Sequence, residues 1–343
     1  MALPRATVLM PLYNGARYVG EAIESILKQT FCDFEFLIID DGSLDNSADI
    51  VRSYNDERIK LICNQNNSGV IDTLNLGITL SQGDYIARMD ADDISRPTRL
   101  AKQIDYLDSN PKVGLCGSWV RFIPRKYDFV WKLPMSSEEI RCLQFSSVGV
   151  AHPSIMFRRK LFLDNDLFYD SKYMYIEDYE LWGRALKLME FANIQEVLLD
   201  YRISSDQICS KHHKEQLMAV RSLRLENIME LGVLPTQDEQ FLHESIINCS
   251  LMHQEFLLDQ AEDWLFRLNA ANVKVGIYDL GLFSKRLLDI WFSMCFNLSN
   301  SGVCSFARCF NSKLWTASSL PELYCLKSVL AWMSAKMKRF SNQ

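Results

Sequence analysis

The amino-acid sequence predicts an α/β fold with a mostly parallel, doubly wound sheet, followed by a mainly α-helical C-terminal region. In the first part of the chain, short apolar segments alternate with segments whose apolar residues recur at helical spacing. Polar clusters directly follow four of the apolar segments. Ligands of doubly wound sheets bind outside the carboxyl ends of the strands, so these clusters predict one shared binding edge.

The predicted elements follow one another closely as far as residue 107. The expected strands are Thr7–Leu12, Phe34–Ile39, Ile59–Cys63 and Tyr85–Met89. The expected helices are Tyr18–Leu27, Asn46–Tyr54, Val70–Leu80 and Arg99–Leu107. A less regular part follows, with strands at Val113–Val120, through Phe157 and at Val197–Tyr201, and with a helix that ends at Leu188.

The sequence after Ser210 contains no catalytic pattern, and we divide the chain into domains at residues 1–210 and 211–343. Helices are expected at Gln216–Leu231 and Asp238–Leu268. Near the end, an apolar helical stripe has basic neighbours. The stripe consists of Leu323, Leu326, Leu330, Met333, Met337 and Phe340, and its basic neighbours are Lys327, Lys336, Lys338 and Arg339. It can pack on the protein's own helices, lie on an anionic inner membrane or form a dimer.

Composition and charge limit the function. The 343 residues are 48% hydrophobic and 23% charged, which is typical of a globular protein. A net charge of −6 argues against generic nucleic-acid binding. From Lys274 onward, nine Lys and Arg face three Asp and Glu, a net +6, which leaves −12 for the preceding residues. This asymmetry predicts that the C-terminal part meets an acidic surface such as a membrane.

The ten cysteines are irregularly spaced and form no C-x-x-C pair, so we expect free thiols in a reducing cytoplasm. No signal peptide is visible, and the apolar run Leu287–Leu298 is shorter than the ~18 residues that span a bilayer. We therefore expect a cytoplasmic protein. The basic C-terminal part further suggests peripheral attachment to the cytoplasmic face of the inner membrane.

Three carboxylates, Asp90, Asp92 and Asp93, directly follow the strand Tyr85–Met89. Like charges this close repel one another, and a cation would hold them together. Carboxylate oxygens suit Mg²⁺ or Mn²⁺, which leave coordination positions for phosphate oxygens. The alternative is a polar loop in which an Asp caps the next helix. The local sequence fits both interpretations.

The other polar clusters at expected carboxyl ends are Pro11–Asn14, Asp40–Asp41 and Asn66–Asn67. The sequence lacks the G-x-G-x-x-G pattern of dinucleotide-binding dehydrogenases and the Walker A loop. It also lacks the basic, glycine-rich loop expected after the first strand of a nucleotidyltransferase. These absences argue against all three classes.

A second acidic group, Glu177, Asp178 and Glu180, stands at the start of a predicted helix. Acidic residues at a helix N-terminus are ordinary capping, but one of them could also be a general base. By itself, His152 fits a core or turn histidine.

Taken together, these motifs resemble the inverting glycosyltransferases of family 2, which have the GT-A fold. Seven matching segments occur in family order over about residues 5–210. They are Pro11-Leu-Tyr-Asn14; Gln29-Thr-Phe31 with Asp33-Phe-Glu35; Asp40-Asp-Gly-Ser-Leu-Asp45; Asn67-Ser-Gly69 with Asn75-Leu-Gly77; Asp90-Ala-Asp-Asp93; His152-Pro-Ser154; and Glu177-Asp178 with Trp182.

The resemblance implies a nucleoside diphosphate sugar as donor, most often UDP-linked. Asp41 would accept the imide N–H of uracil, and Pro11 and Tyr13 would pack on the base. Asp90 would approach the ribose and the metal, and Asp92 would be the principal ligand of Mn²⁺ or Mg²⁺. The remaining nucleotide-binding residues would be Asn14, Asn67 and Arg88.

The resemblance also implies that Asp178 deprotonates the acceptor hydroxyl, which then displaces the diphosphate and inverts the anomeric centre. Partial burial near Glu177 and Glu180 would raise the pKa of this base. Contacts with the donor sugar or acceptor would come from Asp93, His152, Glu177, Trp182 and Arg202. Arg88 and Arg202 equally fit structural ion pairs.

One segment departs from the family pattern Y-R-x-H-x-x-Q-x-S. Tyr201-Arg-Ile-Ser-Ser-Asp-Gln-Ile-Cys209 carries Ser204 at the His position and Cys209 at the final Ser position. His212 and His213 lie nearby. The departure concerns metal dependence rather than the reaction class.

The resulting hypothesis is a hexosyltransferase that extends a surface polysaccharide on a saccharide or lipid-linked acceptor. The alternative is a non-catalytic, nucleotide-binding partner of another transferase. The presence of Asp41, Asp92 and Asp178 favours the enzyme. A processive polymerase is not expected, because no transmembrane helices accompany the domain.

Overall fold

The computed structural model describes residues 3–123, 129–203, 213–248, 257–300 and 312–314. The chain divides into two compact units, Met1–Val220 and Arg221–Gln343. The basic apolar stripe predicted at residues 323–340 lies outside the described residues.

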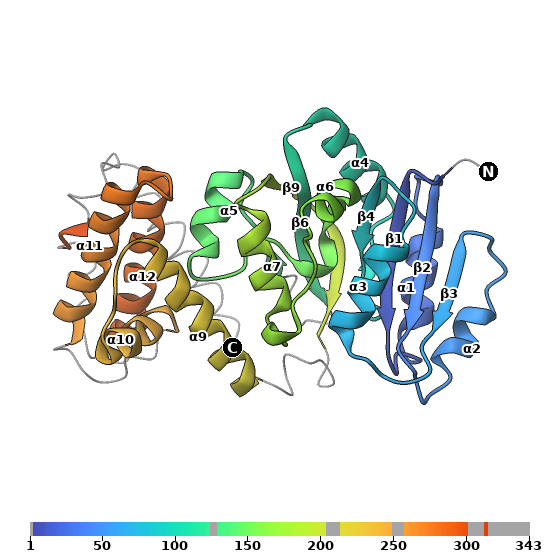
Figure 1. The fold of residues 1–343 in the computed structure, drawn as a ribbon, viewed down its shortest axis with the longest axis horizontal. Coiled ribbons are helices and arrows are strands. Elements are labelled where there is room, and N and C mark those ends of the chain that lie inside the picture. The colour runs from blue at the N-terminus through green and yellow to red at the C-terminus, as the bar shows by residue number, and fades with distance from the viewer. Residues whose placement is uncertain (1–2, 124–128, 204–212, 249–256, 301–311, 315–343) are drawn as a thin grey trace. The chain divides into compact units, whose positions relative to one another are not determined.

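In the first unit, nine strands of the described chain form one sheet (Figure 1). Its spatial order is β3-β2-β1-β4-β8-β6-β9-β5, and β7 pairs with β6. The parallel strands at the start of the chain are β1 (Ala6–Leu12), β2 (Phe34–Asp40), β3 (Ile59–Cys63) and β4 (Tyr85–Arg88). The remaining strands are β5 (Ile94–Ser95), β6 (Val113–Ile123), β7 (Val130–Trp131), β8 (Met156–Arg158) and β9 (Glu190–Arg202).

The sheet is parallel over most of its paired residues. The longest ladder joins β6 and β9 in parallel, and β1 pairs in parallel with both β2 and β4. β8 is antiparallel to β4 and β6, and β5 is antiparallel to β9. The predicted mostly parallel α/β architecture is confirmed.

Helices cover both faces of the sheet, because apolar residues on neighbouring strand positions point to opposite sides. In β1, Val8 and Met10 belong to one buried cluster, whereas Leu9 belongs to the other. The first cluster includes side chains of α1 (Val19–Leu27), α2 (Ser47–Arg52) and α4 (Arg99–Ser109). The second includes α3 (Val70–Leu80), α5 (Ser137–Gln144), α6 (Arg159–Asp164) and α7 (Glu177–Ala185). Two short 3₁₀ turns, η1 (His152–Ser154) and η2 (Ser171–Tyr173), lie between these elements.

Several features of this unit were not predicted, among them the short strands β5 and β7 and the helices α5 and α6. α5 starts with a capping box, in which the side chain of Ser136 accepts the N–H of Glu139 and the Glu139 carboxylate accepts the N–H of Ser136. β9 begins at Glu190, seven residues before the predicted Val197, because its first half also pairs with β6.

The second unit is helical in its described residues. Its helices are α9 (His213–Glu230), which crosses the unit boundary, α10 (Gln237–Ile247), α11 (Leu257–Val275) and α12 (Leu280–Asn300). Among the described helices, none is both long and apolar enough to cross a bilayer.

The prediction of a single helix at Asp238–Leu268 is wrong. Trp264 Nε1 donates a hydrogen bond to His243 Nδ1 at 3.1 Å. In one continuous helix these residues would lie about 30 Å apart, since each residue rises ~1.5 Å. α10 ends instead at Ile247, and α11 packs beside it.

Candidate active site

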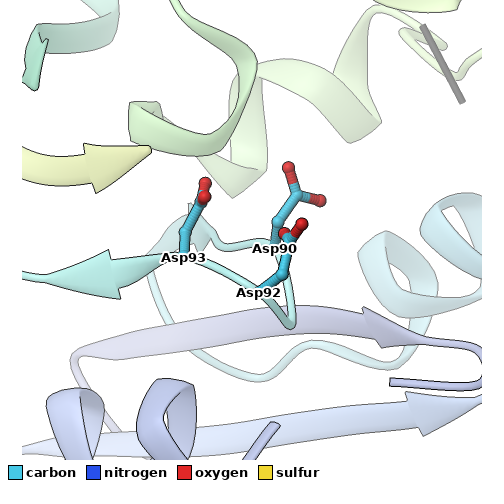
Figure 2. Close-up of side chains that lie close together, drawn as sticks. All are labelled: Asp90, Asp92 and Asp93. Carbon is cyan, nitrogen blue, oxygen red and sulfur yellow. The ribbon is translucent and has the colours of Figure 1, made fainter. Parts of the chain in front are cut away.

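Asp90, Asp92 and Asp93 occupy the turn between β4 and β5, and one carboxylate oxygen of each lies within 4.8 Å of the others (Figure 2). The alternative interpretation, in which an Asp caps the next helix, is wrong. β5 follows the turn, and α4 starts only after Thr98, without a side-chain cap. The parallel strand β4 brings the three carboxylates to the carboxyl end of the parallel strands.

Asp93 shows why this turn suits a cation. Its side chain is fully buried, and its Oδ1 accepts the backbone N–H of Arg202 at 2.8 Å. No described residue donates a hydrogen bond to its Oδ2. Burial, together with the charges of Asp90 and Asp92, raises the pKa of Asp93 well above its ordinary value. A divalent cation would reduce the repulsion between the carboxylates and would give Asp93 Oδ2 a partner. These residues therefore fit a metal.

Arg202 holds this turn in place. Its Nε donates to the backbone carbonyl of Asp92 at 2.7 Å, and its Nη2 donates to Glu21 at 2.8 Å. The guanidinium also lies 4.4 Å from the ring centroid of Tyr18. These contacts give Arg202 a structural role, and its predicted contact with the donor sugar or acceptor stays a prediction.

Arg88, the last residue of β4, places a buried positive charge beside the turn. Its Nη1 donates to Asp90 Oδ2 at 2.5 Å, and the residue is 5% exposed. Burial lowers the pKa of Arg88, but Asp90 and other anionic neighbours raise it to a net value above the ordinary one. Arg99, which the sequence analysis did not single out, donates to the carbonyl of Arg88 at 2.6 Å and fixes the strand end.

The second acidic group lies in the first turn of α7. The Oδ1 of Asp178 accepts the backbone N–H of Tyr179 at 2.7 Å. Burial raises the pKa of Asp178, and burial with the neighbouring Asp178 charge raises the pKa of Glu177 to about 7. Glu180 differs from expectation, because it pairs with Arg184 at 2.5 Å rather than acting on Asp178.

His152 connects this acidic group to the core. Its Nε2 lies 2.8 Å from the Tyr169 hydroxyl, and its Nδ1 lies 4.0 Å from Asp178 Oδ2. Its ring is edge-on to the buried Trp182, with centroids 5.8 Å apart. Burial and the charge of Arg88 lower the pKa of His152 well below its ordinary value, so the imidazole is neutral at pH 7.

Tyr169 was missed by the sequence analysis, because its partners are distant along the chain. Asn75 clamps its backbone: Asn75 Nδ2 donates to the Tyr169 carbonyl, and the Tyr169 N–H donates to Asn75 Oδ1, both at 2.9 Å. Asn75 belongs to the Asn75-Leu-Gly77 segment, which was the available signal.

The two acidic groups act in one electrostatic environment. The positive charge of Arg88 works against the burial-driven rise in the pKa of Glu177 and of Asp178. The charge of Asp90, in contrast, helps to raise the pKa of Asp178. The fold therefore brings residues near 90 and residues near 178 to a common site.

Asp41 anchors a loop in this structure. Its carboxylate accepts the N–H groups of Ser68 and Gly69, and its Oδ1 also accepts Asn64 Nδ2 and Ser68 Oγ, at 2.8–3.2 Å. Burial raises its pKa, but these hydrogen bonds lower the pKa to a net value below the ordinary range. These hydrogen bonds occupy both carboxylate oxygens. Uracil recognition by Asp41 stays a prediction, and it requires one of these hydrogen bonds to the loop to break so that an oxygen can accept from the base.

Asn14 also holds the backbone of the loop after β2 in place. It adopts φ 48°, and its Oδ1 accepts the N–H of Leu44 at 2.8 Å, while its own N–H donates to Ser43 Oγ at 2.9 Å. Pro11 lies within β1, Tyr13 is 48% exposed beyond it, and Asn67 is exposed. The side chains of Tyr13 and Asn67 are therefore accessible to a ligand.

The segment that departs from the family pattern is not described beyond residue 203. Ser204, Cys209 and His212 lie outside the described residues. His213 starts α9, but its side chain is not described.

Comparisons with known proteins agree with this fold and site. The model of glycosyl transferase family 2 matches residues 7–166. An uncharacterized glycosyltransferase of Haemophilus influenzae is 31% identical over 237 residues, which cover 66% of this chain and 73% of the relative. The amylovoran biosynthesis glycosyltransferase AmsE of Erwinia amylovora is 30% identical over 208 residues, covering 59% of this chain and 77% of AmsE.

Among solved structures, S. aureus TarS residues 1–349 in complex with UDP-GlcNAc has a TM-score of 0.59 and 16% sequence identity. The match covers 87% of this chain and 92% of that chain. The fold is that of the GT-A glycosyltransferases. The chain belongs to glycosyltransferase family 2.

Proposed function

We propose that this protein transfers a sugar from a UDP-linked donor to a hydroxyl of a saccharide or lipid-linked acceptor during surface-polysaccharide synthesis. The observation that carries the proposal is the meeting of two acidic groups, one that suits a metal and one whose carboxyl pKa values are raised. The name of AmsE supports the polysaccharide context, and the TarS complex supports UDP as the nucleotide.

On the donor side, the exposed Tyr13 would pack on the base together with Pro11. Asn14 and Asp41 would shape the surrounding loops through the hydrogen bonds that they already make. The accessible Asn67 would contact the nucleotide from the same edge. Arg88 would hold Asp90 in position beside the ribose and diphosphate.

Asp92 and Asp90 would hold Mn²⁺ or Mg²⁺, with the buried Asp93 behind them. A bound metal would act as a Lewis acid that neutralises charge on the departing diphosphate. Arg202 fixes the turn from which these ligands project.

Asp178 would be the general base. Burial raises its pKa above the ordinary value, and a carboxylate of raised pKa accepts a proton more readily. One deprotonated hydroxyl attacking opposite the leaving group would invert the anomeric configuration. Glu177 would titrate together with Asp178, since the charge of Asp178 helps to raise the pKa of Glu177 to about 7.

The test is calorimetric titration with UDP, GDP, CDP and dTDP, each with Mn²⁺ and with EDTA. We expect binding of UDP that requires Mn²⁺ and is lost in Asp92→Ala. The matched control is Asp33→Ala, an exposed aspartate outside the site. Tight binding of a different nucleotide would overturn the assignment of UDP, and no binding to the folded protein would favour the non-catalytic alternative.

A further inference from the structure

We propose that His152 is a positioning residue for the base: its neutral imidazole presents Nδ1–H to Asp178, and Tyr169 fixes the tautomer. This inference rests on the proposed function, in which Asp178 is the base. The nitrogen that faces Asp178 Oδ2 is Nδ1, at 4.0 Å, and the nitrogen that faces the Tyr169 hydroxyl is Nε2, at 2.8 Å.

The hydrogen-bonding pattern selects one tautomer. A neutral imidazole carries a proton on one nitrogen only. Among the described residues, His152 is the sole hydrogen-bond partner of the Tyr169 hydroxyl. A phenol without another acceptor donates to Nε2, because this arrangement uses its proton in a hydrogen bond. Nε2 is then the acceptor, and the imidazole proton resides on Nδ1, facing Asp178.

Rigid surroundings keep this arrangement in place. Tyr169 is 5% exposed, and Asn75 holds its backbone by two hydrogen bonds. Trp182 is fully buried and contacts His152 edge-on. The hydrogen bond to Tyr169 and the contact with Trp182 therefore hold the His152 ring with Nδ1 toward Asp178.

Burial and the positive charge of Arg88 favour the neutral form of His152 and lower its pKa. Arg88 of β4 is the cation that faces it, Glu177 and Asp178 of α7 and Asp90 after β4 are the nearby acids, and Tyr169 is the nearby phenol. The separation of 4.0 Å exceeds a hydrogen bond. Such catalytic contacts often tighten only when substrate binds. In this role His152 keeps its proton and orients one oxygen of Asp178, so that the other can take the acceptor proton.

Nuclear magnetic resonance of ¹⁵N-labelled imidazoles in the full chain tests the tautomer without any substrate. The protein has five histidines, and His152→Gln would assign the signal. We expect the Nδ1–H tautomer from pH 6 to pH 8, with loss of the pure tautomer in Tyr169→Phe. An Nε2–H tautomer or a charged imidazolium in this range would overturn the inference.

Matched kinetic variants test the positioning role. An Asn side chain places its amide nitrogen near the position of Nδ1, whereas a Gln side chain places its nitrogen near Nε2. With UDP-GlcNAc and Mn²⁺ as a probe of UDP release, we expect kcat of His152→Gln to fall about tenfold, the effect of losing one hydrogen bond. His152→Asn should recover most of this loss, and KM should change in neither.

The pH profile separates positioning from a structural defect. Losing a donor to the charged carboxylate raises the pKa of the base. The acidic limb of the kcat profile should therefore move to higher pH in His152→Gln but not in His152→Asn. Equal kcat values and pH profiles in both variants would overturn the inference. If Asp178→Asn kept full UDP release, the proposed function itself would fail, which is a different outcome.

Discussion

At the scale of single residues, the site concentrates carboxylates where burial makes their charge costly. Burial raises the pKa of Glu177 to about 7, from an ordinary value of 4.5. A carboxyl group with a raised pKa in the folded state stabilises the fold below its unfolded pKa, and this contribution is lost as pH rises through about 7. Stability and catalysis therefore respond to pH in opposite directions at this position.

The pH dependence of turnover follows from the same shifts. A general base works only when deprotonated, and Asp178 and Glu177 both have raised pKa values. We expect the acidic fall in kcat, about tenfold per pH unit if one proton is involved, to come at a higher pH than an ordinary Asp carboxyl would give. Measurements of UDP release across pH 5 to 9 would show this. A profile that stays flat down to pH 5 would contradict a base of raised pKa.

The sequence predicted the chemical types at the site better than their contacts. The carboxylates Asp90, Asp92 and Asp178 could be chosen because their positions follow strands or start a helix. The bonds of Asp41 to residues 64–69 depend on how two loops pack. Tyr169 gave no local signal, since its hydroxyl bonds a histidine 17 residues earlier.

At the scale of elements, α3 lies unusually close to β1. A Cβ added at Gly77 would lie 2.2 Å from Leu9 Cδ1 and 3.0 Å from Leu9 Cγ. Leu9 is 1% exposed, so it has little room to move. This close packing supports Asn75, which is two residues away on the same helix and clamps Tyr169.

A pair of glycine substitutions tests that packing. Gly77→Ala should lower the free energy of unfolding by about 1–3 kcal/mol, because it overpacks a filled interface. Gly183→Ala in α7 should raise it by about 0.5–1 kcal/mol, since a Cβ there meets nothing within 4 Å. Urea unfolding of both variants measures the difference. The same sign of effect in the two variants would refute the packing argument.

Element boundaries show where sequence patterns stop being informative. The alternating strands and helices up to α4 were predicted within a few residues, because each has a clear apolar period. The early start of β9 depends on pairing with β6, which is a long-range interaction. α10 and α11 have similar periods, and only the hydrogen bond between His243 and Trp264 shows that they are two separate, packed helices.

At the scale of the whole molecule, the sequence separates an acidic first part from a basic end. The net +6 from Lys274 onward includes the four basic residues that flank the predicted apolar stripe. That stripe lies outside the described residues, so attachment to an inner membrane stays a prediction from charge and periodicity.

Vesicle sedimentation tests this prediction. We expect the full chain to bind phosphatidylglycerol vesicles and not phosphatidylcholine vesicles, with about 1 kcal/mol from each basic residue. Changing Lys327, Lys336, Lys338 and Arg339 to Gln should abolish binding. The control changes four exposed basic residues of the first unit to Gln: Lys28, Arg52, Lys160 and Lys172. Equal loss in both variants would indicate only an effect of net charge.

The central claim is that this family 2 member is an active sugar transferase with Asp178 as its base, and Asp178→Asn tests it most directly. Asn keeps the shape and the acceptor oxygen for the Tyr179 N–H but cannot take a proton. We predict that release of UDP from UDP-sugars falls at least about 100-fold while Mn²⁺-dependent UDP binding is unchanged. Turnover by the variant within tenfold of the unmodified protein would contradict the account.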